Sequence, residues 1–533
     1  MRGGFLLGCP SLMSRPLLKS TTTTGLATLL SRITGLLRDS FMAQVIGVGP
    51  ISDAFYVAFK IPNFLRRLFA DGAFSQSFVP VISEYKTQRG QAEVRELVAG
   101  VSGTLGGVLL LVSALGVIAA PLLIYLFALK WALVGGSQFE LAVQLLRWTF
   151  PYLFFVSLVS LFSGVLNSYG RFFIPAFTHV LMNLVLIIAA VTFAVHSDNP
   201  SLVLAIGVFV AGIVQLLFQL PAVARLGLLS MPRWRPQLDG VRRVVRLMVP
   251  GIVGSSMAQI SLLLDTQIAT SLVTGSVSWL YFADRLIEFP MGVFSIALAT
   301  VILPGLSAHH ASKSMQHFSG TLDWALRLVL LLASPAAVGM LCFAGPMTAM
   351  IFGYRHFTLD DVQRTSYALM AYSWGLMGFS FVKVLVPGYY ARQNTRRPVR
   401  IAMTALAVTI SLNVLVVLPA SRLGFPNPHI LIATSTCVGA AINTLLLWRG
   451  LTREGVLVHS PGWGSFVVRV VASNLIMGAM LLYLAGDTAH WAAMPFIERV
   501  LRGGGSIALA AMVYFAMLYL FGMRYRHLRS VVA

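Results

Sequence analysis

Long apolar runs alternate with short polar segments along nearly the whole chain. A membrane-spanning helix needs about 20 mostly apolar residues, and about fourteen segments have this character. Their approximate limits are 25–47, 53–83, 97–129, 140–168, 174–195, 201–224, 249–273, 277–306, 324–351, 365–390, 399–419, 428–448, 464–485 and 503–523. The pattern predicts an all-α integral membrane protein with about 14 transmembrane helices.

Composition supports a multi-pass membrane protein. The 533 residues are 57% hydrophobic and 11% charged, and the mean hydropathy is +0.81, which excludes an ordinary soluble domain. The net charge of +21 has a topological explanation, so we expect no nucleic-acid partner. With the N-terminus inside, 23 of the 39 Lys and Arg residues lie on the cytoplasmic side and 6 on the other. This asymmetry predicts that both termini are cytoplasmic.

Short sequence matches recur at a nearly constant offset of about 225 residues, as expected for an internal repeat. The matched pairs are Tyr56–Lys60 with Tyr281–Arg285, Val79–Ser83 with Leu303–Ser307, Asp39 with Asp265, and Pro175 with Pro398. Each half contains six predicted spans, an even number, so both halves enter the membrane the same way up. We therefore expect two six-helix lobes related by a parallel pseudo-two-fold repeat, with the substrate site between them.

The repeat sets the expected division of the chain. The segments are a cytoplasmic N-terminal segment 1–24, an N-lobe 25–228, a basic amphipathic linker 229–248, a C-lobe 249–450, two extra C-terminal helices within 451–523, and a cytoplasmic tail 524–533. The arginine-rich linker is expected to form a helix on the inner membrane surface. Met13 is expected to be the true start, which makes 1–12 an upstream extension.

Charged residues recur inside the predicted spans. One charge at the bilayer centre costs roughly 2.5–3.5 kcal/mol on insertion scales, so such residues usually line a hydrated pathway or a binding site. They are Arg32, Arg38 and Asp39 in the first span, Asp53, Lys60, Arg66, Arg67 and Asp71 in the second, Asp265 in the seventh, Asp284, Arg285 and Glu288 in the eighth, and Lys383 in the tenth.

Two interpretations of these charges remain open. They could be ion pairs that only fix helix packing, as the three-residue spacing of Arg285 and Glu288 allows, or they could bind a substrate. Seven bases face six acids, so the net sign does not identify the substrate. Five of the seven bases are arginine, however, and the planar guanidinium suits bidentate contact with phosphate. We therefore expect an anionic, phosphorylated substrate.

We expect no enzymatic site, cofactor or metal in this chain. No nucleophile–base pair, nucleotide-binding loop or pair of catalytic carboxylates is present, so the chain does not hydrolyse ATP itself. The three cysteines are scattered and predict no disulfide framework. His309, His310 and His317 cluster after the eighth span, and we interpret them as a solvated loop in preference to a metal site. A transporter is therefore expected, driven by the membrane potential or by a coupled ion.

The charged motifs closely resemble those of the MurJ/MviN lipid II flippase family, over essentially the whole chain from Met13. The residues that carry the resemblance are Ser31–Asp39 (SRITGLLRD), Asp53–Arg67 (DAFYVAFKIPNFLRR), Gly72–Gln76 (GAFSQ), Gly275–Pro290 (GSVSWLYFADRLIEFP) and Lys383–Gln393 (KVLVPGYYARQ). Asp71 departs from the glutamate that we expect in many relatives. Aspartate keeps the negative charge but has a shorter side chain than glutamate.

The resemblance implies a member of the multidrug/oligosaccharidyl-lipid/polysaccharide exporter superfamily. Such a protein carries lipid II, the lipid-linked peptidoglycan precursor, from the inner to the outer leaflet of the bacterial cytoplasmic membrane for cell-wall synthesis. The implied partners are lipid II, membrane lipids and, as candidates, cell-wall synthesis and division proteins. The implied substrate-binding residues are Arg32, Arg38, Asp39, Asp53, Lys60, Arg66, Arg285, Glu288 and Lys383.

Two other functions remain open at this stage. The chain could export another polyprenyl-diphosphate oligosaccharide or a drug, although a drug or cation exporter would need an acid-dominated cavity and no extra helix pair. It could also act as a membrane scaffold for cell-wall enzymes, in which case neutralising the charges within the spans would cause no loss of function.

Overall fold

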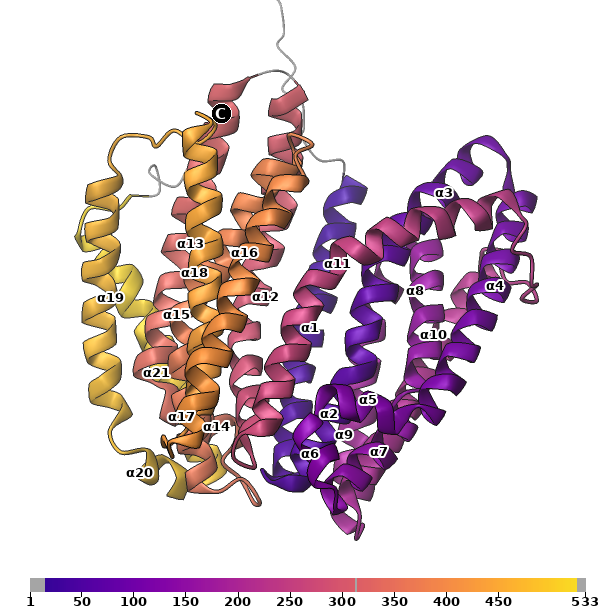
Figure 1. The fold of residues 1–533 in the computed structure, drawn as a ribbon. Helices are drawn as coiled ribbons and strands as arrows, with labels where there is room; N and C mark the ends of the chain where they lie inside the picture. Colours follow the sequence, from indigo (N-terminus) through magenta and orange to yellow (C-terminus); the bar gives the residue numbers. More distant parts are fainter. Residues whose placement is uncertain (1–14, 312–313, 525–533) are drawn as a thin grey trace, which may run out of the picture.

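The computed structural model describes residues 15–311 and 314–524, and all regular secondary structure within these ranges is helical (Figure 1). The N-terminal half comprises α1 (Arg15–Ile46), α2 (Pro50–Arg66), the π-helix η1 (Arg67–Phe74), α3 (Ser75–Gln88), α4 (Gln91–Ile118), α5 (Ala120–Phe127), α6 (Leu129–Val134), α7 (Ser137–Thr149), α8 (Tyr152–Ser168), α9 (Phe173–Ile188), η2 (Ala189–Phe193), η3 (Ala194–His196) and α10 (Pro200–Arg225).

The C-terminal half follows the same all-helical plan. It comprises α11 (Asp239–Ser271), α12 (Ser276–Ala311), α13 (Met315–Cys342), α14 (Ala344–Phe352), α15 (Leu359–Tyr390), α16 (Arg396–Leu412), η4 (Asn413–Val417), α17 (Leu418–Arg422), α18 (His429–Arg453), α19 (Trp463–Ala485), α20 (Thr488–Ala493) and α21 (Phe496–Leu520). Helical structure therefore overlaps each of the predicted apolar segments.

Ten helices among the described residues are long and apolar enough to cross a membrane, so the protein is a multi-pass membrane protein. The predicted spans outside this set are 25–47, 53–83, 249–273 and 277–306. These four carry all the predicted charges within spans except Lys383. The charges are thus concentrated in a few helices, although single charges such as Arg147, Arg327 and Arg469 lie in other spans. Those few helices form most of the contact between the two halves of the molecule.

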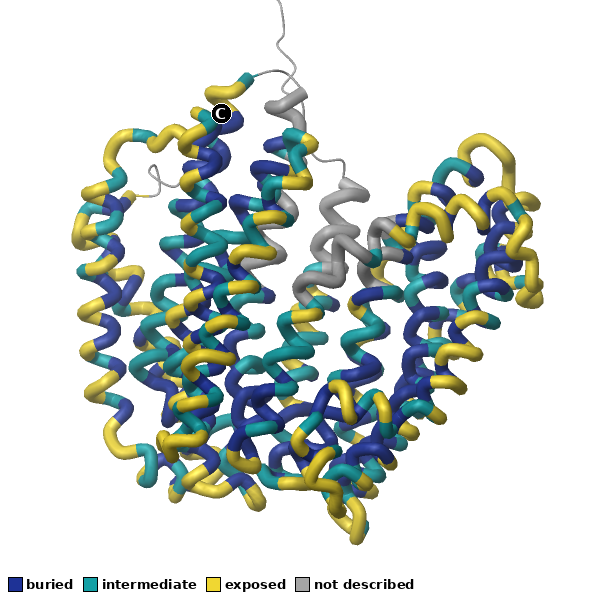
Figure 2. The backbone as a smooth tube through the Cα atoms, in the orientation of Figure 1, coloured by how far each residue is buried: buried dark blue, intermediate teal, exposed yellow. Residues whose placement is uncertain are grey.

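The molecule consists of two helical bodies that meet at one end and diverge at the other (Figure 1). We call α1–α10 the N-lobe and α12–α18 the C-lobe. α11 contacts both lobes, packing against η1 and α3 on one side and against α12 and α16 on the other. Figure 2 shows that buried backbone is concentrated at the end where the lobes meet, which we call the closed end. α1 begins and α21 ends at the opposite, diverging end.

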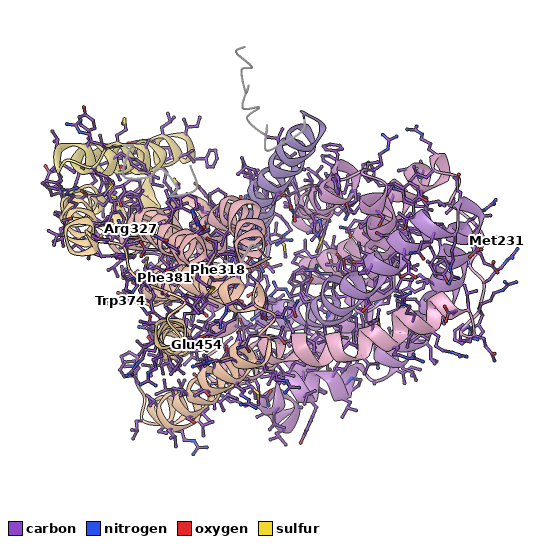
Figure 3. The ribbon with its side chains drawn as sticks, turned by 90° about the horizontal axis from the view of Figure 1, so that it is seen from above. Met231, Phe318, Arg327, Trp374, Phe381 and Glu454 are labelled. Carbon is purple, nitrogen blue, oxygen red and sulfur yellow. The ribbon has the colours of Figure 1, made fainter. Side chains whose placement is uncertain are left out.

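The interlobe linker differs from the helix expected over 229–248. Helix begins only at Asp239, where α11 starts and continues without interruption into the seventh predicted span. The preceding residues run as an extended strap along α4, and the backbone N–H of Arg233 donates to the carbonyl of Ala99 at 2.9 Å. Pro232 and Pro236 explain the difference, because proline lacks the N–H that a helix interior requires. Met231 accordingly lies at the edge of the N-lobe farthest from the C-lobe (Figure 3).

Glycines on α4 make room for this strap. A Cβ atom at Gly103 would overlap the backbone of Arg233, and one at Gly107 would lie 2.6 Å from the Trp234 ring. Both positions therefore need a residue without a side chain, so that the strap can lie against the helix. The strap holds the start of α11 on the N-lobe, and α11 packs mainly against N-lobe elements, above all η1 and α3.

We expect Gly103→Ala to destabilise the protein by about 1–3 kcal/mol, because the added methyl group must displace the backbone of the strap. The matched control is Gly106→Ala on the same helix, where a Cβ would meet only the side chain of Leu158 at 3.7 Å. Thermal unfolding of the purified protein in detergent measures the difference. Equal melting temperatures for the two variants would contradict the packing described above.

Candidate functional site

The charged residues of α1, α2 and α12 come together where the lobes meet. Asp39 lies at the centre, with a side chain only 1% exposed. Its Oδ1 accepts hydrogen bonds from Arg38 Nε at 3.0 Å and Nη2 at 2.7 Å, and from the Tyr281 hydroxyl at 3.0 Å. Arg285 Nε lies 3.7 Å from its Oδ2. One buried carboxylate thus contacts its own helix and two side chains of the other lobe.

Arg38 is held on both of its faces. Its Nη1 donates to the side-chain oxygen of Asn183 on α9 at 3.0 Å, and the amide of Asn183 donates in turn to the Ser31 carbonyl and to Thr34. The Arg38 guanidinium is also 5.9 Å from the ring centroid of Phe59. This arginine is therefore an organised part of the N-lobe and is almost fully withdrawn from solvent.

Glu288 is shared by arginines from three helical elements. Arg285 Nη1 donates to its Oε2 at 2.6 Å, which confirms the expected i,i+3 pair. Arg32 and Arg67 each approach a Glu288 oxygen to 3.8 Å, longer than a hydrogen bond. Their side chains are 40% and 42% exposed, against 22% for Glu288. Lys383 also interacts electrostatically with Glu288 and Arg32. Three arginines thus approach one glutamate, with the charge of Lys383 nearby.

Asp53 forms a polar contact across the lobes that we call the latch. Its carboxylate accepts hydrogen bonds from the backbone N–H of Gly275 at 2.6 Å, the backbone N–H of Ser278 at 2.9 Å and the Ser278 hydroxyl at 2.6 Å. These donors lie at the start of α12, where a helix presents unpaired N–H groups and a partial positive charge. Gly275 has a φ of +96°, and a Cβ there would meet the Trp279 ring. The latch therefore needs glycine at this position.

The remaining predicted site residues lie at the sides of this cluster. Lys60 interacts electrostatically with Asp284 and Asp265, among other charged groups. Arg66 Nε donates to the Asn63 side chain at 3.3 Å. Asp265 accepts from the amide of Asn413 at 2.9 Å.

Of the charged residues and histidines singled out in the sequence analysis, three have side chains outside those that the structure describes. They are Asp71, His309 and His310. The expected loop is largely helical, because His309 and His310 belong to the end of α12 and His317 to the first turn of α13. The His317 Nδ1 lies 2.6 Å from the Ser314 hydroxyl. Among the residues that the structure describes, no group of three His, Cys, Asp or Glu side chains is placed to hold a metal ion.

The structure adds partners that the charge pattern did not reveal. Tyr281, Ser278 and Asn183 each bond a predicted site residue. A signal existed for Tyr281, because the internal repeat pairs it with Tyr56, and these two rings stack across the interface with centroids 4.0 Å apart. Asn183 stands out as an amide within an apolar span. Nothing in the sequence pointed to backbone N–H groups as the partners of Asp53.

Comparison with known proteins decides the family. A family model described as "Lipid II flippase MurJ" matches residues 42–502. "Probable lipid II flippase MurJ" of Haemophilus influenzae is 43% identical over 513 residues, covering 94% of this chain and 99% of that protein. "Lipid II flippase MurJ" of Burkholderia cenocepacia is 39% identical, covering 96% and 99%. The chain belongs to the MurJ lipid II flippase family.

Solved structures show that the MurJ fold is shared more widely. The structure described as "Lipid II flippase MurJ, inward closed conformation" matches with a TM-score of 0.76 at 24% identity, covering 95% of this chain and 99% of that one. An inward-facing multidrug resistance MATE transporter of the MOP superfamily matches with a TM-score of 0.63 at 15% identity, covering 81% and 98%. At these identities the likeness concerns the fold alone.

We expect Asp53→Asn to open the closed end. The neutral amide loses the charge that strengthens all three latch hydrogen bonds, and each such bond to a charged group is worth about 1.5–3 kcal/mol. A suitable reporter is Ser276→Cys in a cysteine-free background, because Ser276 is fully buried beside the latch. The S276C thiol should react with a water-soluble maleimide at least about tenfold faster in D53N. Equal rates would show that the latch does not control access.

Proposed function

We propose that this protein flips lipid II from the inner to the outer leaflet of the bacterial cytoplasmic membrane by alternating access. The observation that carries the proposal is the arginine group around Glu288. Arg32, Arg67 and Arg285 present planar donors from both lobes to one point, and two of them are about two-fifths exposed. Such an arrangement fits a diphosphate, the charged part of a polyprenyl-linked precursor. Membership of the MurJ family supports the same substrate.

The proposed topology places the diverging end in the cytoplasm. The arginine-rich linker and the segments assigned to the inner side lie there, in keeping with the positive-inside rule. Both termini are then cytoplasmic, and the helices form 14 spans, with two six-span lobes followed by α19 and α21. The stacking of Tyr56 on Tyr281, residues that the repeat makes equivalent, supports a two-fold axis between the lobes.

The proposed cycle begins with the headgroup entering from the diverging end. The diphosphate binds Arg32, Arg67 and Arg285, while Glu288 gives up part of its contact with them. Rocking of the lobes then separates Asp53 from Gly275 and Ser278 and opens the other side. Arg38–Asp39 stays paired within the N-lobe and Arg285–Glu288 within the C-lobe, whereas Asp53 loses its three donors and exchanges them for water.

The site favours this substrate over the alternatives. An exporter of cationic drugs would need acids at the exposed part of the site, and here the exposed side chains are arginines. A scaffold without transport would not need a polar latch across the lobes beside a group of exposed guanidinium groups. Another polyprenyl-diphosphate oligosaccharide has the same charged centre, and a direct assay with defined precursors separates it from lipid II.

We expect Arg285→Ala to abolish lipid II transport while the protein still accumulates in the membrane. The change leaves Glu288 without its 2.6 Å partner and removes one phosphate-binding guanidinium. Growth of cells depleted of their own flippase measures the loss, and immunoblotting measures accumulation. Arg89→Ala is a matched control, because Arg89 is exposed in the turn after α3 and pairs with Glu93 at the start of α4. Normal growth on the R285A protein alone would refute the binding role.

We expect the inside-negative membrane potential to drive transport. Moving two negative charges outward gains about 4–5 kcal/mol per 100 mV, and the chain contains no nucleotide-binding motif. Collapsing the potential with a potassium ionophore should therefore slow the appearance of precursor in the outer leaflet, as measured by a leaflet-specific assay. An unchanged rate in the same cells, with a retained pH gradient, would eliminate the potential as the driver and favour a coupled ion.

A further inference from the structure

Arg499 is a buried arginine whose charge is compensated by backbone carbonyls. It lies in the first turn of α21 and is 3% exposed. Its Nη1 donates to the carbonyls of Ala349 at 3.0 Å and Gly353 at 2.5 Å, and its Nη2 to those of Ala492 at 2.5 Å and Met494 at 2.8 Å. Arg499 therefore joins two separate stretches of backbone by means of one guanidinium.

Both stretches are helix C-termini. Ala349 and Gly353 belong to the end of α14, and Ala492 and Met494 to the end of α20. The last carbonyls of a helix lack intrahelical partners and carry a partial negative charge, which favours a cation. The Tyr354 ring completes the site, 4.7 Å below the guanidinium. The planar fork reaches both helix ends at once, which the single point charge of a lysine cannot do.

The end of α14 is also a contact point for the N-lobe at the closed end. The Ser40 hydroxyl of α1 donates to the carbonyl of Ile351 at 2.5 Å. Just beyond, a Cβ at Gly47 would lie 2.6 Å from the carbonyl of His356, so α1 and the loop after α14 run in close contact. Arg499 thus holds the piece of the C-lobe on which α1 rests.

We propose that Arg499 is a positioning residue through which α19–α21, the helices outside the repeat, stabilise closure of the lobes. Arg499 fixes the C-terminal end of α14, and this end supports α1 where the closed end forms. The appended helix pair then sets the balance between the two access states of the transporter. This inference rests on the proposed alternating-access function.

Close packing supports the rigidity of this connection. A Cβ at Gly345 of α14 would overlap the hydroxyl of Thr488 on α20, and one at Gly503 of α21 would lie 2.5 Å from the sulfur of Met350 on α14. The rings of Tyr354 and Phe496 meet at 5.4 Å beside Arg499. Since α14, α20 and α21 touch at several points, displacement of α21 at this joint also displaces α14.

The test measures access to the closed end in intact cells. The reporter is Ser276→Cys in a chain carrying Cys9→Ser, Cys342→Ala and Cys437→Ala, labelled with a membrane-impermeant maleimide. We expect Arg499→Gln to raise the labelling rate about tenfold, since charge-assisted hydrogen bonds are lost. Arg502→Gln is the matched control, because it makes the same change on an exposed residue of the same helix, and it should label at the parent rate.

A milder variant covers the case in which R499Q does not accumulate. Phe496→Ala removes only the exposed ring that packs on Tyr354, so the protein should fold and label a few times faster than its parent. Parent-rate labelling of R499Q, or of F496A when R499Q does not accumulate, would overturn the proposal. So would equal acceleration in R502Q, because any change on α21 would then have the same effect.

The latch variant separates this inference from the proposed function. If D53N labels fast and R499Q labels at the parent rate, closure is confirmed as the reported event and only the role of Arg499 fails. If D53N also labels at the parent rate while lipid II still appears in the outer leaflet, the closed end described here is not the gate of the transport cycle. The proposed mechanism then fails, and the inference about Arg499 fails with it.

Discussion

The structure depends on how a buried carboxylate, Asp39, is compensated inside a membrane-spanning helix. Taking a charge out of water is costly unless strong partners replace the solvent. Arg38 supplies two hydrogen bonds from the next position on the same helix, whereas Tyr281 and Arg285 approach from the other lobe. The negative charge of Asp39 is therefore fully compensated only when the two lobes are in contact. The helices that carry these groups must meet, and they meet where Figure 2 shows the deepest burial.

Ion pairs within a lobe are shorter than those between the lobes, as expected if the lobes move apart. The short ion pairs lie within lobes: Arg38–Asp39 at 2.7 Å and Arg285–Glu288 at 2.6 Å. The charged contacts between lobes are longer, at 3.7–3.8 Å. Separation therefore breaks the longer ion pairs and leaves the two short pairs intact, although it also breaks the 3.0 Å hydrogen bond from Tyr281 to Asp39. Asp53 is the exception, since all three of its hydrogen bonds come from the other lobe. It becomes fully compensated only on closure or on contact with water.

Much of the fold followed from the sequence because apolar length and charge placement are local properties. The helical segments, the Arg285–Glu288 pair and the repeat-related tyrosines could all be found by spacing. The partners of Asp53 could not, because they are backbone groups at the start of a distant helix. Arg38–Asn183 joins residues 145 positions apart, and no periodicity reveals such a contact. The linker prediction was wrong for its first half, where Pro232 and Pro236 disfavour a helix, whereas the residues from Asp239 onward are helical.

The numbers of acids and bases within the spans do not identify the substrate, because a count treats buried and exposed charges alike. Glu288 is the acid that three arginines approach together, and in the proposed function this placement would help the site to release its ligand as well as bind it. Without an acid, several arginines around a diphosphate would hold it too tightly for passage. In the cycle proposed above, Glu288 would compete with phosphate for the same guanidinium groups and would re-occupy them as the ligand leaves. Arg285 holds Glu288 at 2.6 Å, whereas Arg32 and Arg67 stand 3.8 Å away, too far for a hydrogen bond. In the proposed cycle, Arg32 and Arg67 would therefore be the arginines that an incoming phosphate engages first.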